Sequence, residues 1–208
     1  MSTTTIQTIL DAILQRRSNY NLQNTSPIPD SEIQQIITHA ILHVPSAFNA
    51  QTTRVILLLG QEHHHLWEGI VKEILSGIVP GEAFATTEKK LNAFRDAYAT
   101  ILFFEDQASV RSYQEKFSLY ADRFPVWASE SSGMHQYAIW TALAVQGLAA
   151  NLQHYNPLID QKVAARWNVA PKWKLVSQMV IGTPLSPPST SKTFLPVNER
   201  FRTYGSVE

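Results

Sequence analysis

Cysteine is absent from this chain of 208 residues. Its absence excludes disulfide bonds, thiolate metal sites and cysteine nucleophiles. An excess of charge of either sign is also missing, because 17 basic residues balance 17 acidic ones. No global electric field therefore favours nucleic acid or an anionic membrane as a partner. Any site that binds a phosphate group must be local.

Long apolar runs are missing as well. No run approaches the roughly 20 residues of a membrane-spanning helix, and the N-terminal residues do not resemble a signal peptide. Internal repeats, low-complexity segments and domain linkers do not stand out either. With 44% hydrophobic residues in 23.4 kDa, the chain can bury a sizeable core. We expect a single domain over residues 1–208 of a soluble, cytoplasmic protein that binds neither nucleic acid nor membranes.

Two short polar clusters each follow an amphipathic stretch, at residues 16–20 (RRSNY) and residues 45–51 (PSAFNAQ). The arginine pair and the following serine suit a phosphate or another dianion, because guanidinium groups match phosphate oxygens with a planar fork of donors. Asn49 and Gln51 each offer an amide that both donates and accepts. Together the clusters indicate a ligand with an anionic tail and a planar edge of carbonyls and ring nitrogens. A flavin mononucleotide (FMN) fits that description.

The arginine pair also has a simpler interpretation. Ile6, Ile9, Leu10 and Ile13 recur at helical spacing and predict a first helix that ends near residue 15. Positive side chains at the C-terminal end of a helix complement its dipole and can hydrogen-bond its last carbonyls. From these residues alone, helix capping and phosphate binding are both open.

Periodicity and turn signals predict the remaining elements. Helices are expected from Asp30, as N-cap, to before Pro45, over 66–97 with interruptions, over 129–151 and over 158–167. Buried strands are expected over 55–59, 99–104 and 173–181. The tail after residue 184 is too apolar for a disordered charged arm, and we expect it to dock on another surface.

Two groups of ionisable residues have simple interpretations. Residues 63–65 are three consecutive histidines, which point about 100° apart on a helix and cannot converge on one metal ion, so a solvated helix start is favoured. Glu105 and Asp106 could be a catalytic acid and base, but the favoured interpretation is that they end a strand where it meets solvent. His154 lacks a partner at the spacing of a catalytic triad. The turn over 152–157 is instead expected to present backbone amides to a ligand.

An aromatic-rich stretch between residues 109 and 127 has two interpretations. Its rings recur along the segment at Tyr113, Phe117, Tyr120, Phe124 and Trp127. Such residues commonly pack a core, and this is the favoured interpretation. A movable lid over a flat ligand is the alternative.

The order of these features resembles the FMN-dependent nitroreductase family. The features are the Arg-Arg-Ser and Pro-Ser-x-x-Asn-x-Gln clusters, a long helix that runs into Gly147, a strand that ends in Gly-Thr-Pro at 182–184, and a basic C-terminal element. Residues 147–157 and 173–179 resemble the fatty-acid-repression-mutant (Frm2-like) branch and its copper-induced bacterial relatives. The resemblance covers nearly the whole chain and depends on order and spacing more than on any single motif.

The resemblance implies an α+β fold, with a mixed, mostly antiparallel sheet wrapped by helices. It also implies an obligate homodimer with two FMN sites in the interface. In this family the C-terminal segment of one subunit commonly adds to the partner's sheet, which would explain a tail that docks.

The same resemblance implies which residues hold the phosphate and ribityl chain of FMN. Tyr20 stands where many relatives carry a basic residue, and it departs from the family's pattern. The implied set on this side of the cofactor is Arg16, Arg17, Ser18 and Tyr20, with Lys192 or Arg202 as the basic C-terminal contact.

Residues near the flavin ring follow from the resemblance too. Asn49 and Gln51 are implied to contact the ring or the ribityl oxygens. Tyr155 and Asn156 lie where the family usually offers backbone amides to the flavin N5 edge. Ala149 interrupts a Gly-Leu-Gly sequence that is common in the branch.

The implied activity is a ping-pong oxidoreductase reaction in which NADH or NADPH reduces FMN and a small aromatic acceptor, a nitroaromatic compound or a quinone, takes the electrons. No residue is expected to act as a covalent nucleophile, so no catalytic residue and no metal ligand is assigned. Two alternatives remain. One is a flavin oxidoreductase with a different physiological acceptor, and the other is a flavin-binding regulatory or stress-response protein that turns over slowly.

Overall fold

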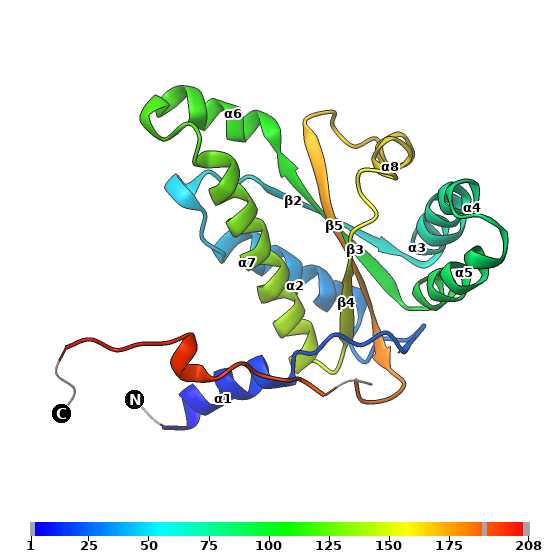
Figure 1. Cartoon of the computed structure of the whole chain (residues 1–208), viewed down its shortest axis with the longest axis horizontal. Helices are drawn as coiled ribbons and strands as arrows, with labels where there is room; N and C mark the ends of the chain where they lie inside the picture. The colour runs from blue at the N-terminus through cyan, green and yellow to red at the C-terminus, as the bar shows by residue number, and fades with distance from the viewer. Residues whose placement is uncertain (1–2, 189–190, 206–208) are drawn as a thin grey trace.

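The computed structural model describes residues 3–188 and 191–205 (Figure 1). One sheet has the strand order β1-β5-β3-β2, and β4 also pairs with β5. All pairings between the named strands are antiparallel. The strands are β1 (Leu22–Gln23), β2 (Thr53–Leu59), β3 (Ala99–Asp106), β4 (Ala149–Gln153) and β5 (Trp173–Pro184).

Helices cover both faces of this sheet (Figure 1). A π-helical segment, η2, joins α3 and α4, and three short 3₁₀ turns lie elsewhere among the described residues. The α-helices are α1 (Thr3–Gln15), α2 (Asp30–His43), α3 (Gly60–His64), α4 (Glu73–Ile78), α5 (Gly81–Arg95), α6 (Gln107–Lys116), α7 (Phe124–Val145) and α8 (Asp160–Trp167). The shorter segments are η1 (Ala47–Asn49), η2 (His65–Lys72), η3 (Ser118–Tyr120) and η4 (Val197–Glu199).

The hydrophobic core has two halves, one on each face of the sheet. Successive residues of a strand point to opposite faces. Ile101 and Phe103 of β3 accordingly pack with α2 and α7, whereas Leu102 and Phe104 pack with η2, α5 and α8. All eight residues of β3 are buried, so this central strand is covered on both sides.

The three predicted strands are confirmed, and each is longer than the apolar run that predicted it. Two further strands were missed. β1 has only two residues, which is too short for a periodic signal. The first three residues of β4 lie in the segment that was predicted as a long helix, and its last two lie in the predicted turn.

The predicted helix over residues 129–151 is wrong at both ends. α7 begins at Phe124, with Pro125 in its first turn, and ends at Val145. Gly147 then takes a φ of 84°, which turns the chain out of the helix. Residues 149–153 pair with residues 178–182 of β5, so the polar turn expected from residue 152 begins later. Small apolar residues are compatible with helix or strand, and the partner strand decides between them.

The expected solvated start at residues 63–65 is wrong for His63, which has no exposed surface. Its Nε2 lies 3.0 Å from the Arg95 carbonyl and its Nδ1 lies 2.9 Å from the Thr100 hydroxyl. The Trp67 Nε1–H donates to that hydroxyl at 2.9 Å, so the hydroxyl can donate to a neutral imidazole. Burial lowers the pKa of His63 to about 4. This histidine is a neutral core residue.

The expected solvent-facing strand end at Glu105 and Asp106 is also wrong, because both residues are buried. Burial raises the pKa of Glu105. Burial would raise the pKa of Asp106 too, but the backbone N–H groups of Ala108 and Ser109 and the charge of Arg54 outweigh it and lower that pKa. Asp106 is the N-cap of α6 and forms a 2.9 Å ion pair with Arg54.

The start of the second predicted helix also differs from expectation. Pro29 takes the N-cap position of α2, and the Asp30 carboxylate accepts a hydrogen bond from the Tyr98 hydroxyl. Residues 191–205 are exposed in the single chain, so the expected docking of the tail on another surface stays a prediction. The single-domain prediction includes residues 1–2, 189–190 and 206–208, which lie outside the described residues.

Candidate active site

The arginine cluster lies at the junction of α1 and α7. The Gln15 Nε2 donates to the Ala144 carbonyl at 2.9 Å and fixes the end of α1 to the last turn of α7. Arg16 follows, with its Cζ 4.5 Å from the centroid of the Trp140 ring. Within the described chain, the Arg16 Nε is buried without a hydrogen-bond partner. A buried donor without an acceptor is unfavourable, so this position suits an anionic ligand.

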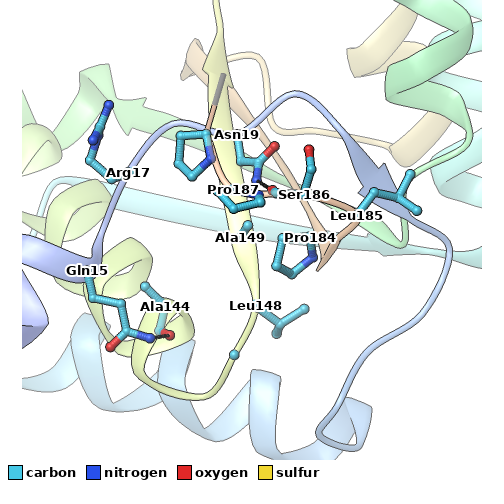
Figure 2. Close-up of a pocket in the computed structure, with 12 residues that line it drawn as sticks. Gln15, Arg17, Asn19, Ala144, Leu148, Ala149, Pro184, Leu185, Ser186 and Pro187 are labelled. Carbon is cyan, nitrogen blue, oxygen red and sulfur yellow. Dashed lines mark hydrogen bonds between the residues drawn. The ribbon is translucent and has the colours of Figure 1, made fainter. Parts of the chain in front are cut away.

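Arg17 lines a cavity of about 420 Å³ between the end of α7 and residues 184–188 (Figure 2). Asn19 lines the same cavity, and its Nδ2 donates to the Ser186 carbonyl at 2.7 Å. The Asn151 Nδ2 in turn donates to the Asn19 carbonyl at 2.8 Å. Asn19 therefore joins the arginine cluster to β4 and to the segment after β5.

Sequence reasoning missed this role of Asn19. Its place between Ser18 and Tyr20 was the available signal, but an asparagine in a polar turn has no distinguishing pattern. Ser18 forms a parallel bridge with Ala150 of β4 and is exposed.

Tyr20 does not line the Arg17 cavity. Half of its surface is exposed, and it lines a different groove with Lys89 and Lys90. Lys192 and Arg202 lie on the exposed C-terminal segment. Their predicted contacts with phosphate therefore remain predictions.

The loop after β4 carries Tyr155 and Asn156. Gln178 of β5 is fully buried and holds both residues: its Oε1 accepts from the Tyr155 N–H at 2.8 Å, and its Nε2 donates to the Asn156 Oδ1 at 3.3 Å. The Tyr155 N–H therefore already has an acceptor inside the protein, and the predicted contact with a ligand would have to share this donor. The Tyr155 ring packs edge-on against Trp67, and its burial raises the pKa of the phenol.

Asn49 and Gln51 lie on an exposed loop that leads into β2. Their φ angles are 54° and 47°, in the left-handed region. The Asn49 N–H donates to the Ser46 carbonyl at 2.9 Å, and the Gln51 N–H donates to the Ser46 hydroxyl at 3.0 Å. These bonds leave both side-chain amides at the surface, as a binding role requires.

The two polar clusters do not meet within one chain. The Ser131 hydroxyl near the start of α7 donates to the Pro45 carbonyl, while Ala144 near its end holds Gln15. These two anchor points are 13 positions apart on the helix, which is about 20 Å along its axis. One chain therefore brings the arginine cluster beside β4 and leaves Asn49 and Gln51 at the opposite end of α7.

The Nitroreductase family model matches residues 13–183 of the chain. The chain belongs to the nitroreductase family. This nitroreductase, an oxidoreductase, has the α+β fold of its family with an antiparallel sheet, and its sequence resemblance is confirmed. It is 32% identical over 189 residues to the nitroreductase FRM2 of Saccharomyces cerevisiae, which covers 89% of this chain and 92% of FRM2.

Solved structures agree with this assignment. The nitroreductase CinD of Lactococcus lactis, solved in complex with chloramphenicol, is 42% identical to this nitroreductase with a TM-score of 0.87, over 95% of this chain and 100% of CinD. CinD has also been solved in complex with 4-nitrophenol. A protein of Desulfovibrio desulfuricans in complex with FMN shares the fold, at 19% identity and a TM-score of 0.66 over 95% of this chain and 96% of that one.

Metal-ligand clusters and membrane-spanning helices are both absent from the described part of this nitroreductase. No group of three or more histidine, aspartate or glutamate side chains is placed to hold a metal ion. Likewise, none of the helices within residues 3–188 and 191–205 is long and apolar enough to cross a membrane.

Proposed function

We propose that this nitroreductase binds FMN and uses NADH or NADPH to reduce nitroaromatic compounds or quinones. The observation that carries the proposal is the arginine cluster, where the buried Arg16 Nε has no acceptor among the described residues and Arg17 lines a cavity. Phosphate oxygens pair with guanidinium groups through charge-assisted hydrogen bonds. The small aromatic ligands bound to CinD support an aromatic acceptor.

In the proposed complex the chain binds and orients the cofactor. Arg16, Arg17 and Ser18 hold the phosphate end, and Lys192 or Arg202 adds positive charge. Asn156, fixed by Gln178, lies at the ring end of the site. When bound, FMN supplies the redox chemistry by accepting a hydride from a nicotinamide and passing electrons to the acceptor. No side chain needs to act as a nucleophile.

A homodimer completes this site. Asn49 and Gln51 lie near one end of α7 and the arginine cluster of the same chain lies near the other, with about 20 Å along the helix axis between the residues that hold them. We propose that these amides contact the FMN of the partner subunit. A two-fold axis would pair each arginine cluster with the amides of the other chain and form two equivalent sites.

Exposed apolar surface supports the same assembly. The first helix exposes five large apolar residues and the C-terminal segment exposes five more: Ile6, Ile9, Leu10, Ile13, Leu14, Phe194, Leu195, Val197, Phe201 and Tyr204. Contiguous apolar patches of this kind mark interaction surfaces in soluble proteins. We propose that a second copy covers α1, and that the C-terminal segments are exchanged between subunits.

The decisive experiment is the visible spectrum of the purified, desalted protein, followed by anaerobic addition of NADH, or of NADPH, and then of chloramphenicol. A flavin spectrum that bleaches with the nicotinamide and returns with the acceptor is the expected result. A protein that stays colourless after incubation with FMN would contradict the proposal. Bound flavin that no acceptor reoxidises anaerobically would favour the regulatory alternative.

A further inference from the structure

The loop that carries Asn49 and Gln51 has an unusual backbone. Residues 46–51, here called the amide loop, include three non-glycine residues in the left-handed region, with φ of 55° at Phe48, 54° at Asn49 and 47° at Gln51. Asparagine tolerates this region, but a bulky residue such as phenylalanine rarely adopts it. Such a conformation persists only where its surroundings hold it.

The Phe48 ring is the first of two contacts that hold the amide loop from outside. Its centroid lies 4.7 Å from that of Phe117, and three other rings lie within 6.3 Å. We call these four rings the aromatic cluster: Phe117, Tyr120, Phe124 and Trp127. Phe48 is still 50% exposed, so its ring covers the cluster without being enclosed.

Arg54 of β2 provides the second contact. Its Nη1 donates to the Gln51 carbonyl at 2.6 Å, and its Nη2 pairs with Asp106 at 2.9 Å. Asp106 caps α6, the helix that leads to Phe117. The amide loop therefore has two connections to α6 and the residues that follow it. One is the contact of the Phe48 ring with Phe117, and the other runs from the Gln51 carbonyl through Arg54 to Asp106.

We propose that Phe48 is a positioning residue for the flavin site, whose ring, held by the aromatic cluster, keeps Asn49 and Gln51 in the orientation that binds FMN. The inference rests on the proposed binding of FMN at a dimer interface. Loss of the ring frees the left-handed segment to relax toward common backbone conformations, and both side-chain amides then change direction. Binding across the interface weakens, although Phe48 itself needs no contact with the cofactor.

The test compares FMN affinity in three variants of the full-length apoprotein, measured by quenching of FMN fluorescence, with thermal unfolding recorded in parallel. Phe48→Leu is expected to weaken FMN binding roughly tenfold, as loss of a supporting residue around a site does. Phe48→Tyr keeps the ring and should bind FMN as the wild type does. Phe84→Leu is the matched control, since Phe84 is half-buried in α5 on the other face of the sheet.

The outcomes separate the two proposals. If the wild-type apoprotein does not bind FMN, the proposed function fails and the inference fails with it. If it binds FMN but Phe48→Leu binds equally well, or only as weakly as the equally destabilised Phe84→Leu, the positioning role alone is overturned. Asp106→Asn, which keeps a helix cap but removes the charge facing Arg54, should also weaken binding. Its effect should be less than additive with Phe48→Leu, because both changes release one loop.

Discussion

At the scale of single residues, Arg16 combines two environments. Its guanidinium lies over Trp140, which fixes the side chain, and its buried Nε has no acceptor among the described residues. Sequence alone left helix capping and ligand binding equally open for this residue. The position of the guanidinium over Trp140 of α7 is compatible with the phosphate role, which stays a proposal.

Replacement of Arg16 by alanine is expected to weaken FMN binding by about 10- to 100-fold, the range that corresponds to one charge-assisted hydrogen bond. Flavin content after desalting and a fluorescence titration measure the effect. Arg166→Ala is the control, because Arg166 pairs with Glu62 at the surface on the opposite face of the sheet. Unchanged flavin content in both Arg16→Ala and Arg17→Ala would contradict the phosphate assignment.

His63 supports a prediction about pH. The pKa of His63 is about 4 in the folded protein and near 6.5 in the unfolded chain. Between these values the unfolded chain binds a proton that the folded protein does not, so the free energy of unfolding falls as the pH drops from about 6.5 to about 4. The loss from this one group is up to about 3 kcal/mol.

Urea unfolding of wild type and His63→Gln at pH 7 and pH 4.5 measures this contribution. Glutamine does not titrate, so the variant is less stable at pH 7 but should lose less stability on acidification. Equal losses in the two proteins would show that other groups dominate acid unfolding.

At the scale of elements, the transition from α7 to β4 is a boundary that hydrophobic periodicity did not locate. Alanines and leucines continue past Val145 at helical spacing, so composition favours an unbroken helix. Gly147 was the available sign of a break. The structure shows that the helix does end before Gly147, because residues 149–153 pair with β5 as a strand.

Gly147→Ala should reduce the free energy of unfolding by roughly 1 kcal/mol, since alanine is strained at a φ of 84°. Gly77→Ala is the matched control: Gly77 lies in α4 at an ordinary φ, and an added Cβ would meet nothing within 4 Å. Alanine there should stabilise the helix by about 0.5–1 kcal/mol. Chemical unfolding of both variants measures the change in the free energy of unfolding, which should have opposite signs. If Gly147→Ala leaves this free energy unchanged, the left-handed turn at Gly147 is contradicted.

At the scale of the whole molecule, the single chain leaves its predicted site in two parts and its first helix uncovered. Both features have the same proposed explanation, a second copy of the chain. The wild-type protein should therefore have about twice the 23.4 kDa mass of one chain in solution.

Leu14→Glu tests this assembly, because Leu14 is 75% exposed on α1 and a charge there should not disturb the fold of one chain. A carboxylate buried in a dimer interface is strongly unfavourable, so the variant should become monomeric and lose FMN. Ile78→Glu, at an exposed residue of α4, is the control that should stay dimeric. Light scattering coupled to size-exclusion chromatography gives both masses. A dimeric Leu14→Glu with normal flavin content would remove α1 from the interface.

The sequence by itself indicated the family, through the order and spacing of its motifs, and the resemblance implied the α+β class. It also predicted the three long strands and several of the helices, because hydrophobic periodicity and turn residues act locally. Only the tertiary structure decided the burial of His63, Glu105 and Asp106, the identity of β4, and the hold of Gln178 on Tyr155 and Asn156. Each of these features depends on a contact with a residue far away in the chain. The residues next to it in the sequence do not indicate which distant residue that is. The separation of Arg16 from Asn49 is also visible only in the tertiary structure, because the two residues lie near opposite ends of α7.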